Sequence, residues 1–120
     1  MQAKSIRAFL GAKNYDVSRA FYREMNFEEV IIDTQMSYFQ VNDSLGFYLQ
    51  NAYVKDWVDN SMIFLEVEDL EDFQEDLLRR ALHRKFQNVR ISEIVPQDWG
   101  QEFFLHDPSG ILWHFGNFKT

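Results

Sequence analysis

A strand, a helix and three further strands form a pattern that occurs twice in this chain of 120 residues. Moving the first half forward by 64 positions brings similar residues into register: Phe39 on Phe103, Val41 on Leu105, Asp43 on Asp107 and Gly46 on Gly110. An Asp at a turn and a Gly three residues later therefore recur in both halves. Two copies are too few for a solenoid, so the pattern predicts an internal duplication within an α+β fold.

Short runs rich in apolar residues predict the strands, and polar breaks separate them. The runs lie at 4–10, 28–33, 37–41 and 45–50 in the first half and at 61–67, 88–94, 101–106 and 111–115 in the second. Residues 51–60 are interpreted as a connector. We therefore expect a single domain over 1–120, with a first module at about 1–50 and a second at about 61–120.

One helix is predicted in each module. Asn14 or Asp16 can cap the first helix, and Asn26 can end it in a left-handed conformation. Its expected buried face has apolar residues at helical spacing: Val17, Ala20, Phe21 and Met25. Asp69 is the expected cap of the second helix, whose buried stripe is Leu70, Phe73, Leu77 and Ala81. Acidic residues at its start and basic residues at its end complement the helix dipole, which explains the acidic run without a binding role.

Composition excludes several classes of partner. The formal net charge of −7 would repel a phosphate backbone, so nucleic acid is not an expected partner, whereas a cationic small molecule would be attracted. The same charge also serves plain solubility. No apolar run approaches the ~18 residues of a membrane span, the start of the chain does not resemble a signal peptide, and there is no cysteine. These features favour a cytoplasmic protein.

Several segments resemble the vicinal oxygen chelate superfamily, which contains glyoxalase I, extradiol dioxygenases, and fosfomycin and bleomycin resistance proteins. They are the doubled element order, the helix end at 20–27 and the hairpin Asp107-Pro108-Ser109-Gly110. Residues 98–110 are similar to the segment PWGREFALRDPAGN of bleomycin resistance proteins, and Asp59-Asn60-Ser61 also looks like theirs. The resemblance implies two tandem βαβββ modules, a curled mixed sheet around a central cup, and a homodimer.

The resemblance also locates the positions at which catalytic members hold a divalent metal. Here they fall near Arg7, near Met62, near Tyr48 or Gln50, and on His114. Arginine is a permanent cation and would repel a metal ion, and a single imidazole does not hold one. We therefore expect no metal and no other cofactor, and no catalytic residue is assigned.

For ligand binding, the resemblance implies a crevice at the dimer interface. Trp99 would stack on a flat ring, Gly100 would let the ligand approach the backbone, and Glu102 and Asp59 would supply negative charge. The remaining candidates are an aromatic wall and hydrogen-bonding groups of the cup: Met36, Tyr38, Tyr48 and His114.

Structural explanations stay open for the same candidates. Trp99 could close the core beneath the hairpin, Asp59 could be a turn residue, and Glu102 could face water. Trp113 and His114 are adjacent on one predicted strand, so they point to opposite faces. If His114 faces the cup, Trp113 packs against a helix.

The favoured function is metal-independent binding of an aromatic, antibiotic-like molecule by sequestration, and the net charge favours a cationic one. Two alternatives remain. One is a divergent lyase or dioxygenase with a degenerate metal site, or acid–base chemistry through His114 and Glu66. The other is a scaffold whose cup is filled by its own side chains.

Overall fold

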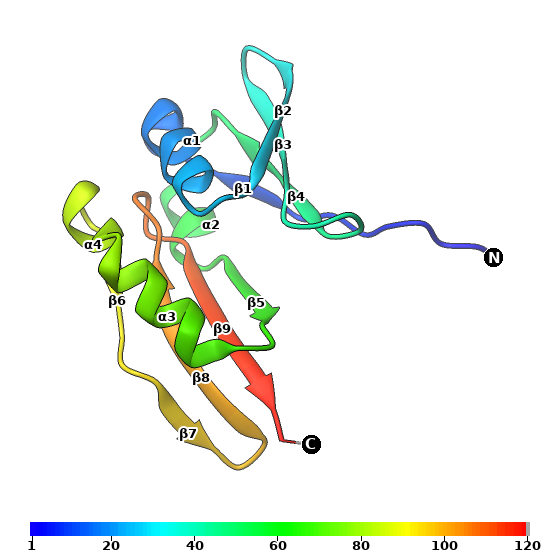
Figure 1. The fold of residues 1–120 in the computed structure, drawn as a ribbon. Helices are drawn as coiled ribbons and strands as arrows, with labels where there is room; N and C mark the ends of the chain where they lie inside the picture. The colour runs from blue at the N-terminus through cyan, green and yellow to red at the C-terminus, as the bar shows by residue number, and fades with distance from the viewer. Residues whose placement is uncertain (120) are drawn as a thin grey trace.

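The computed structural model describes residues 1–119, which form two mixed β-sheets, each with its own helices (Figure 1). The first sheet has the order β1-β4-β3-β2. Its strands are β1 (Phe9–Gly11), β2 (Glu28–Asp33), β3 (Met36–Gln40) and β4 (Gly46–Gln50). β1 lies parallel to β4, and the other neighbours are antiparallel. Polar turns between the apolar runs make these antiparallel pairings local, so the sequence located β2, β3 and β4 to within one residue.

The second sheet repeats this path with the order β5-β9-β8-β6. Its strands are β5 (Met62–Glu66), β6 (Arg90–Ile91), β7 (Val95–Gln97), β8 (Gly100–His106) and β9 (Leu112–Phe118). β5 lies parallel to β9, as β1 does to β4, which confirms the predicted α+β fold of two βαβββ modules. The prediction of one strand over 88–94 is wrong, because β6 and β7 pair with β8 separately. Between them the Ser92 hydroxyl accepts the Phe104 amide hydrogen and interrupts the backbone pairing with β8.

The helix α1 (Tyr15–Glu24) follows β1. Asn14 is its cap, since Oδ1 accepts the Val17 amide hydrogen at 3.2 Å, and Asn26 has the predicted positive φ of 67°. The expected buried face was wrong at Val17, which is 37% exposed. Ser18 and Tyr22 are buried instead, because they contact the turn of the second module.

Three further helices differ from the sequence expectation. The connector contains the short helix α2 (Lys55–Asp59). The second predicted helix is two helices, α3 (Leu70–Arg79) and α4 (Leu82–Lys85), because Ala81 adopts a left-handed conformation with φ of 56°. Asp69 lies at the cap position of α3, but its side chain makes no capping hydrogen bond there. None of the helices in residues 1–119 is both long and apolar enough to span a lipid bilayer.

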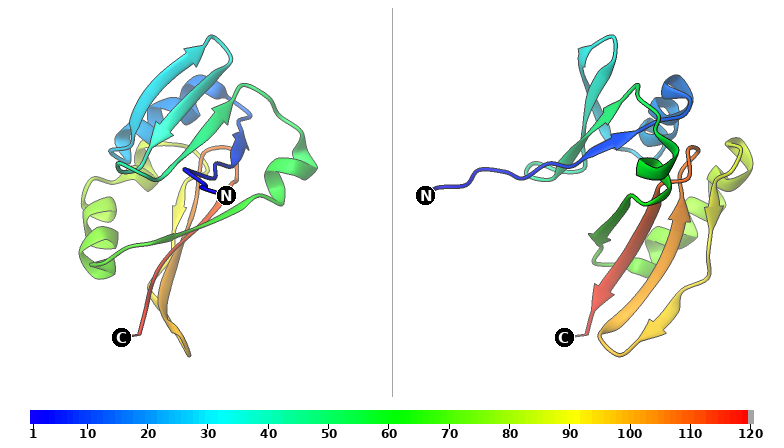
Figure 2. Two further views of the ribbon diagram at one scale, coloured as in Figure 1. Left: turned by 90° about the vertical axis from the view of Figure 1, so that its right-hand side faces the viewer. Right: turned by 180° about the vertical axis from the view of Figure 1, so that it is seen from behind.

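The first strand is shorter than the predicted run 4–10 and begins at Phe9. Within residues 1–119, no strand pairs with residues 1–8; the Ala8 carbonyl alone accepts a backbone hydrogen bond, from the Tyr48 amide. They form an exposed arm that projects away from the side on which the helices lie (Figure 1 and Figure 2). Alternation of residues predicts an extended backbone but not the presence of a partner strand.

The two modules share one hydrophobic core. Trp113 of β9 is 2% exposed, and its ring centroid lies 5.4 Å from that of Phe47 and 5.8 Å from that of Tyr22 in the first module. Tyr22 donates a hydrogen bond to Asp107 at 2.6 Å and accepts one from the Trp113 indole at 3.0 Å. This core fixes the two sheets relative to each other.

Candidate functional site

Each sheet buries one face in the core and leaves the other face open. In β3 and β4 one face is buried, and its side chains are Ser37, Phe39, Phe47 and Leu49. The residues between them point to the opposite face. We call this the first open face; it consists of Phe9, Val30, Met36, Tyr38 and Tyr48. The second open face belongs to the other sheet and consists of Met62, Phe64, Glu66, Trp99, Glu102, Phe104, His114 and Phe118.

The first open face carries a cation among aromatic rings. The Arg7 guanidinium donates a hydrogen bond to the Tyr48 hydroxyl at 2.8 Å and lies 4.2 Å from the centre of the Tyr38 ring. Phe9 stacks on Tyr48 with a centroid separation of 4.8 Å. Tyr38 and Tyr48 thus share one surface, and Arg7 provides its positive charge.

The second open face holds a cluster of three aromatic rings. The Phe64, Trp99 and Phe118 centroids lie 5.2–5.7 Å apart. Phe64 and Phe118 are 44% and 51% exposed, so this cluster faces outward instead of closing the core. Flat, partly exposed rings of this kind can stack on a planar ligand.

Glu102 and His114 meet beside this aromatic cluster. The Glu102 Oε1 atom lies 2.9 Å from Nδ1 of His114, and Oε2 accepts a hydrogen bond from the Gln97 amide at 3.0 Å. Glu102 is 7% exposed, so it does not face water. His114 lies on the open face whereas Trp113 is in the core, as the alternation of β9 predicted; Trp113 packs mainly on rings of the first module.

The other predicted residues are distributed differently. Met36 lies on the first open face, two positions before Tyr38 on the same strand. Asp59 is in α2, outside both open faces, and forms an ion pair with Lys55 at 2.7 Å. A Cβ atom at position 100 would lie 1.9 Å from the Asn117 carbonyl oxygen. Glycine is therefore required at position 100 because the backbone at Asn117 lies so close, and this requirement does not depend on a ligand.

Sequence reasoning missed Phe64, Phe118 and Gln97. A signal for Phe64 was present, because residues 62–65 are apolar at every position. Such a strand has an apolar side chain on both faces, which indicates that a second surface covers it or binds something. No local pattern indicated that Gln97 would contact Glu102, since that contact depends on the pairing of β7 with β8.

The residues present do not fit the metal site of catalytic relatives. Arg7 is engaged with Tyr48, and Met62 offers a soft thioether. His114 is then the one imidazole at these positions, and a single imidazole does not hold a metal ion. Within residues 1–119, no three His, Cys, Asp or Glu side chains come together in a group that could hold a metal ion. We derive no chemistry through a metal for this chain.

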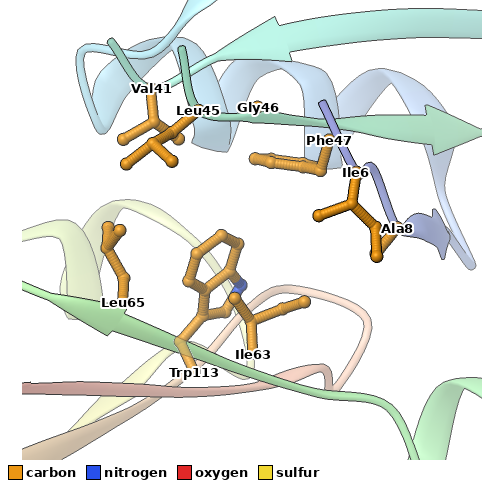
Figure 3. Close-up of a pocket in the computed structure, with 9 residues that line it drawn as sticks. All are labelled: Ile6, Ala8, Val41, Leu45, Gly46, Phe47, Ile63, Leu65 and Trp113. Carbon is orange, nitrogen blue, oxygen red and sulfur yellow. The ribbon is translucent and has the colours of Figure 1, made fainter. Parts of the chain in front are cut away.

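An apolar cleft of about 280 Å³ lies where the modules meet (Figure 3). Its lining side chains include Val41, Leu45 and Phe47 from the first module and Ile63, Leu65 and Trp113 from the second. The indole nitrogen of Trp113 is already bonded to Tyr22, so no lining side chain offers a free polar group. None of the eight predicted binding residues lines this cleft.

Comparisons with known proteins place the fold. No family model matches the chain, and no curated protein matches it. Among solved structures, a bleomycin-binding protein from Streptomyces verticillus complexed with copper(II)-bleomycin has a TM-score of 0.82 at 18% identity, over 99% of both chains. A bleomycin resistance determinant encoded on transposon Tn5 has a TM-score of 0.81 at 21% identity, over 98% of this chain and 100% of that one.

Enzymes of the same fold are also similar. A fosfomycin resistance protein from Listeria monocytogenes complexed with Mn(II) has a TM-score of 0.72 at 14% identity, over 99% of this chain and 93% of that one. Identities this low show a shared architecture and leave the ligand open. The chain has the fold of these bleomycin-binding and bleomycin-resistance structures.

Proposed function

We propose that this chain is a metal-independent binding protein that sequesters an aromatic, cationic, antibiotic-like small molecule between two copies of itself. The observation that carries this proposal is the second open face, where the partly exposed rings of Phe64, Trp99 and Phe118 lie beside the Glu102–His114 pair. Such rings attract a planar or cationic group, and the net charge of −7 adds a long-range attraction for cations.

A second copy is the proposed cover of the open faces. Five large apolar side chains on these faces are each at least 44% exposed: Phe9, Val30, Met62, Phe64 and Phe118. Neighbouring exposed apolar side chains of this kind are typical of an interaction surface. The first open face carries Arg7, and the second carries Glu66 and Glu102. In a two-fold dimer, the first face of one copy can meet the second face of the other twice, with opposite charges together.

One similar structure is a bleomycin-binding protein and another is a bleomycin resistance determinant, so bleomycin is the specific ligand that we propose. Sequestration acts by mass action, so protection from a drug would require protein in excess over it. We also propose a cytoplasmic location, because the chain has no cysteine and so cannot form the disulfides that are common in secreted proteins.

Bleomycin titration tests the ligand proposal. We expect saturable quenching of tryptophan fluorescence, and about tenfold weaker binding of the Trp99→Ala variant, because a stacked indole contributes about 0.5–2 kcal/mol. Trp57→Phe is the matched control, since it removes an indole from α2, away from both open faces. Equal affinity of all three proteins would contradict the proposed site. Recovery of chemically unchanged ligand separates sequestration from enzymatic turnover.

Charge reversal at Arg7 tests the dimer proposal. We expect Arg7→Glu to raise the dimer dissociation constant about tenfold or more, because a carboxylate would then face Glu66 and Glu102 of the partner copy. Sedimentation equilibrium over a concentration series measures this constant. Arg84→Glu makes the same charge change on α4, on the helix side, and should leave the constant unchanged. A monomer at all concentrations for the unaltered chain would refute this arrangement.

A further inference from the structure

The environment of Glu102 gives this residue a role other than direct attraction of a cation. Its carboxylate is on the second open face, yet the residue is 7% exposed and both oxygens are engaged. The contacts come from three adjacent strands: Gln97 from β7, Glu102 from β8 and His114 from β9. This burial keeps the carboxylate from direct contact with a ligand, so we expect it to act through His114.

The contact with Glu102 determines what His114 can offer. An ionised carboxylate only accepts hydrogen bonds, so the Nδ1 atom at 2.9 Å must carry the hydrogen. A neutral imidazole has one donor and one acceptor nitrogen, so Nε2 is then the acceptor. No hydrogen bond from residues 1–119 reaches Nε2. The unused lone pair is therefore available to a bound molecule.

Two aromatic rings hold the imidazole in place. Phe104 meets it edge-on with a centroid distance of 5.1 Å, and Phe64 stacks on it at 6.4 Å with an angle of 28° between the planes. Phe64 is also part of the aromatic cluster with Trp99. A planar ligand stacked on that cluster would therefore lie near the His114 ring.

We propose that Glu102 is a positioning residue that fixes His114 in the Nδ1–H tautomer, and that Nε2 accepts a hydrogen bond from an N–H or O–H group on a planar ring. The ligand class follows from this pairing: the ring must carry a donor hydrogen at its edge. The ligand half of this inference rests on the proposed binding function, whereas the tautomer is a property of the free protein.

Nitrogen-15 NMR of the imidazole rings tests the first half on the unliganded chain. We expect His114 to show the Nδ1–H tautomer in the unaltered protein and to lose it, wholly or in part, in Glu102→Gln, because an amide can donate as well as accept. Glu66→Gln is the matched control: it removes a carboxylate from the same open face without a contact to His114. An Nε2–H tautomer in the unaltered protein, or the same tautomer in Glu102→Gln, would overturn the positioning role.

Indole and 1-methylindole test the second half, because only indole has a donor hydrogen. We expect indole to shift the Nε2 resonance of His114 and to bind about 3- to 10-fold more tightly than 1-methylindole, the value of one net hydrogen bond. Equal affinities, or no movement of Nε2, would overturn the acceptor role. Failure of bleomycin to bind would count against the proposed drug alone, since the tautomer and indole results do not depend on it.

Discussion

Replacement of Trp113 by alanine is expected to lower the free energy of unfolding by about 3–5 kcal/mol, the range for a buried aromatic residue in a core. Trp113 is 2% exposed and contacts Tyr22, Phe27 and Phe47 of the first module with centroid distances of 5.4–5.9 Å. The change removes these contacts and the hydrogen bond to Tyr22 together. Urea unfolding followed by far-ultraviolet circular dichroism measures it, since that signal does not depend on the indole itself.

Two companion variants make the result decisive. Trp113→Phe keeps a ring in the core and should cost less than the alanine change, so it provides a folded protein if Trp113→Ala does not fold. Phe118→Ala removes a ring that is 51% exposed and should cost under about 1 kcal/mol. We expect one cooperative transition in every case, because both modules share the core. Two separate transitions would show that the modules fold independently. Equal costs for Trp113→Ala and Phe118→Ala would show that Trp113 does not stabilise a shared core.

The stability contributed by Asp107 is expected to fall as the pH rises from about 4 to about 7. Burial raises the pKa of this carboxyl from 3.8 to about 6, although hydrogen bonds from Tyr22 and from backbone amides oppose the shift. The folded state therefore holds the proton more tightly than the unfolded chain. The contribution is fully present below the unfolded pKa and is lost as the pH passes through about 6. One pKa unit corresponds to about 1.4 kcal/mol, so the loss is about 3 kcal/mol.

Asp107→Asn should remove this dependence, because an amide does not titrate in this range. The Oδ1 position can still accept from the Ser109 and Ile111 amides, while the hydrogen bond from Tyr22 is lost at every pH. The measurement is the difference in unfolding free energy between the variant and the unaltered chain across the pH range. Asp43→Asn is the matched control at the corresponding, exposed position of the first module. Parallel pH curves for all three proteins would contradict the raised pKa.

Asp43 and Asp107 also show how much of the structure the sequence repeat predicts. The shift that pairs them also pairs Phe39 with Phe103, and both phenylalanines are fully buried on corresponding strands. The same shift does not hold for the side chain that stabilises the turn. In the second module Asp107 accepts the Ser109 amide hydrogen, whereas in the first module Asn42, and not Asp43, accepts the Ser44 amide hydrogen. Asp43 is exposed and Asp107 is buried because Tyr22 covers only the second turn. Repetition in sequence thus predicted the strands but not their surroundings.

The candidate site was also predicted only in part from the sequence. Alternation along β9 was sufficient to predict that His114 and Trp113 point to opposite faces. The resemblance added Trp99 and Glu102, which lie on the same open face as His114. The buried state of Glu102, its contact with His114 and the cluster of Trp99 with Phe64 and Phe118 all depend on pairings among β5, β7, β8 and β9.

The sequence by itself determined the duplicated α+β order, most strands to within a residue or two, and the opposite directions of Trp113 and His114. These properties follow from periodicity and turn chemistry, which act over a few neighbouring residues. Only the tertiary structure decided which faces are covered, that Arg7 joins Tyr38 and Tyr48, and that Tyr22 buries Asp107 from 85 positions away. Burial and charge pairing arise from residues distant in the chain, so no local pattern encodes them.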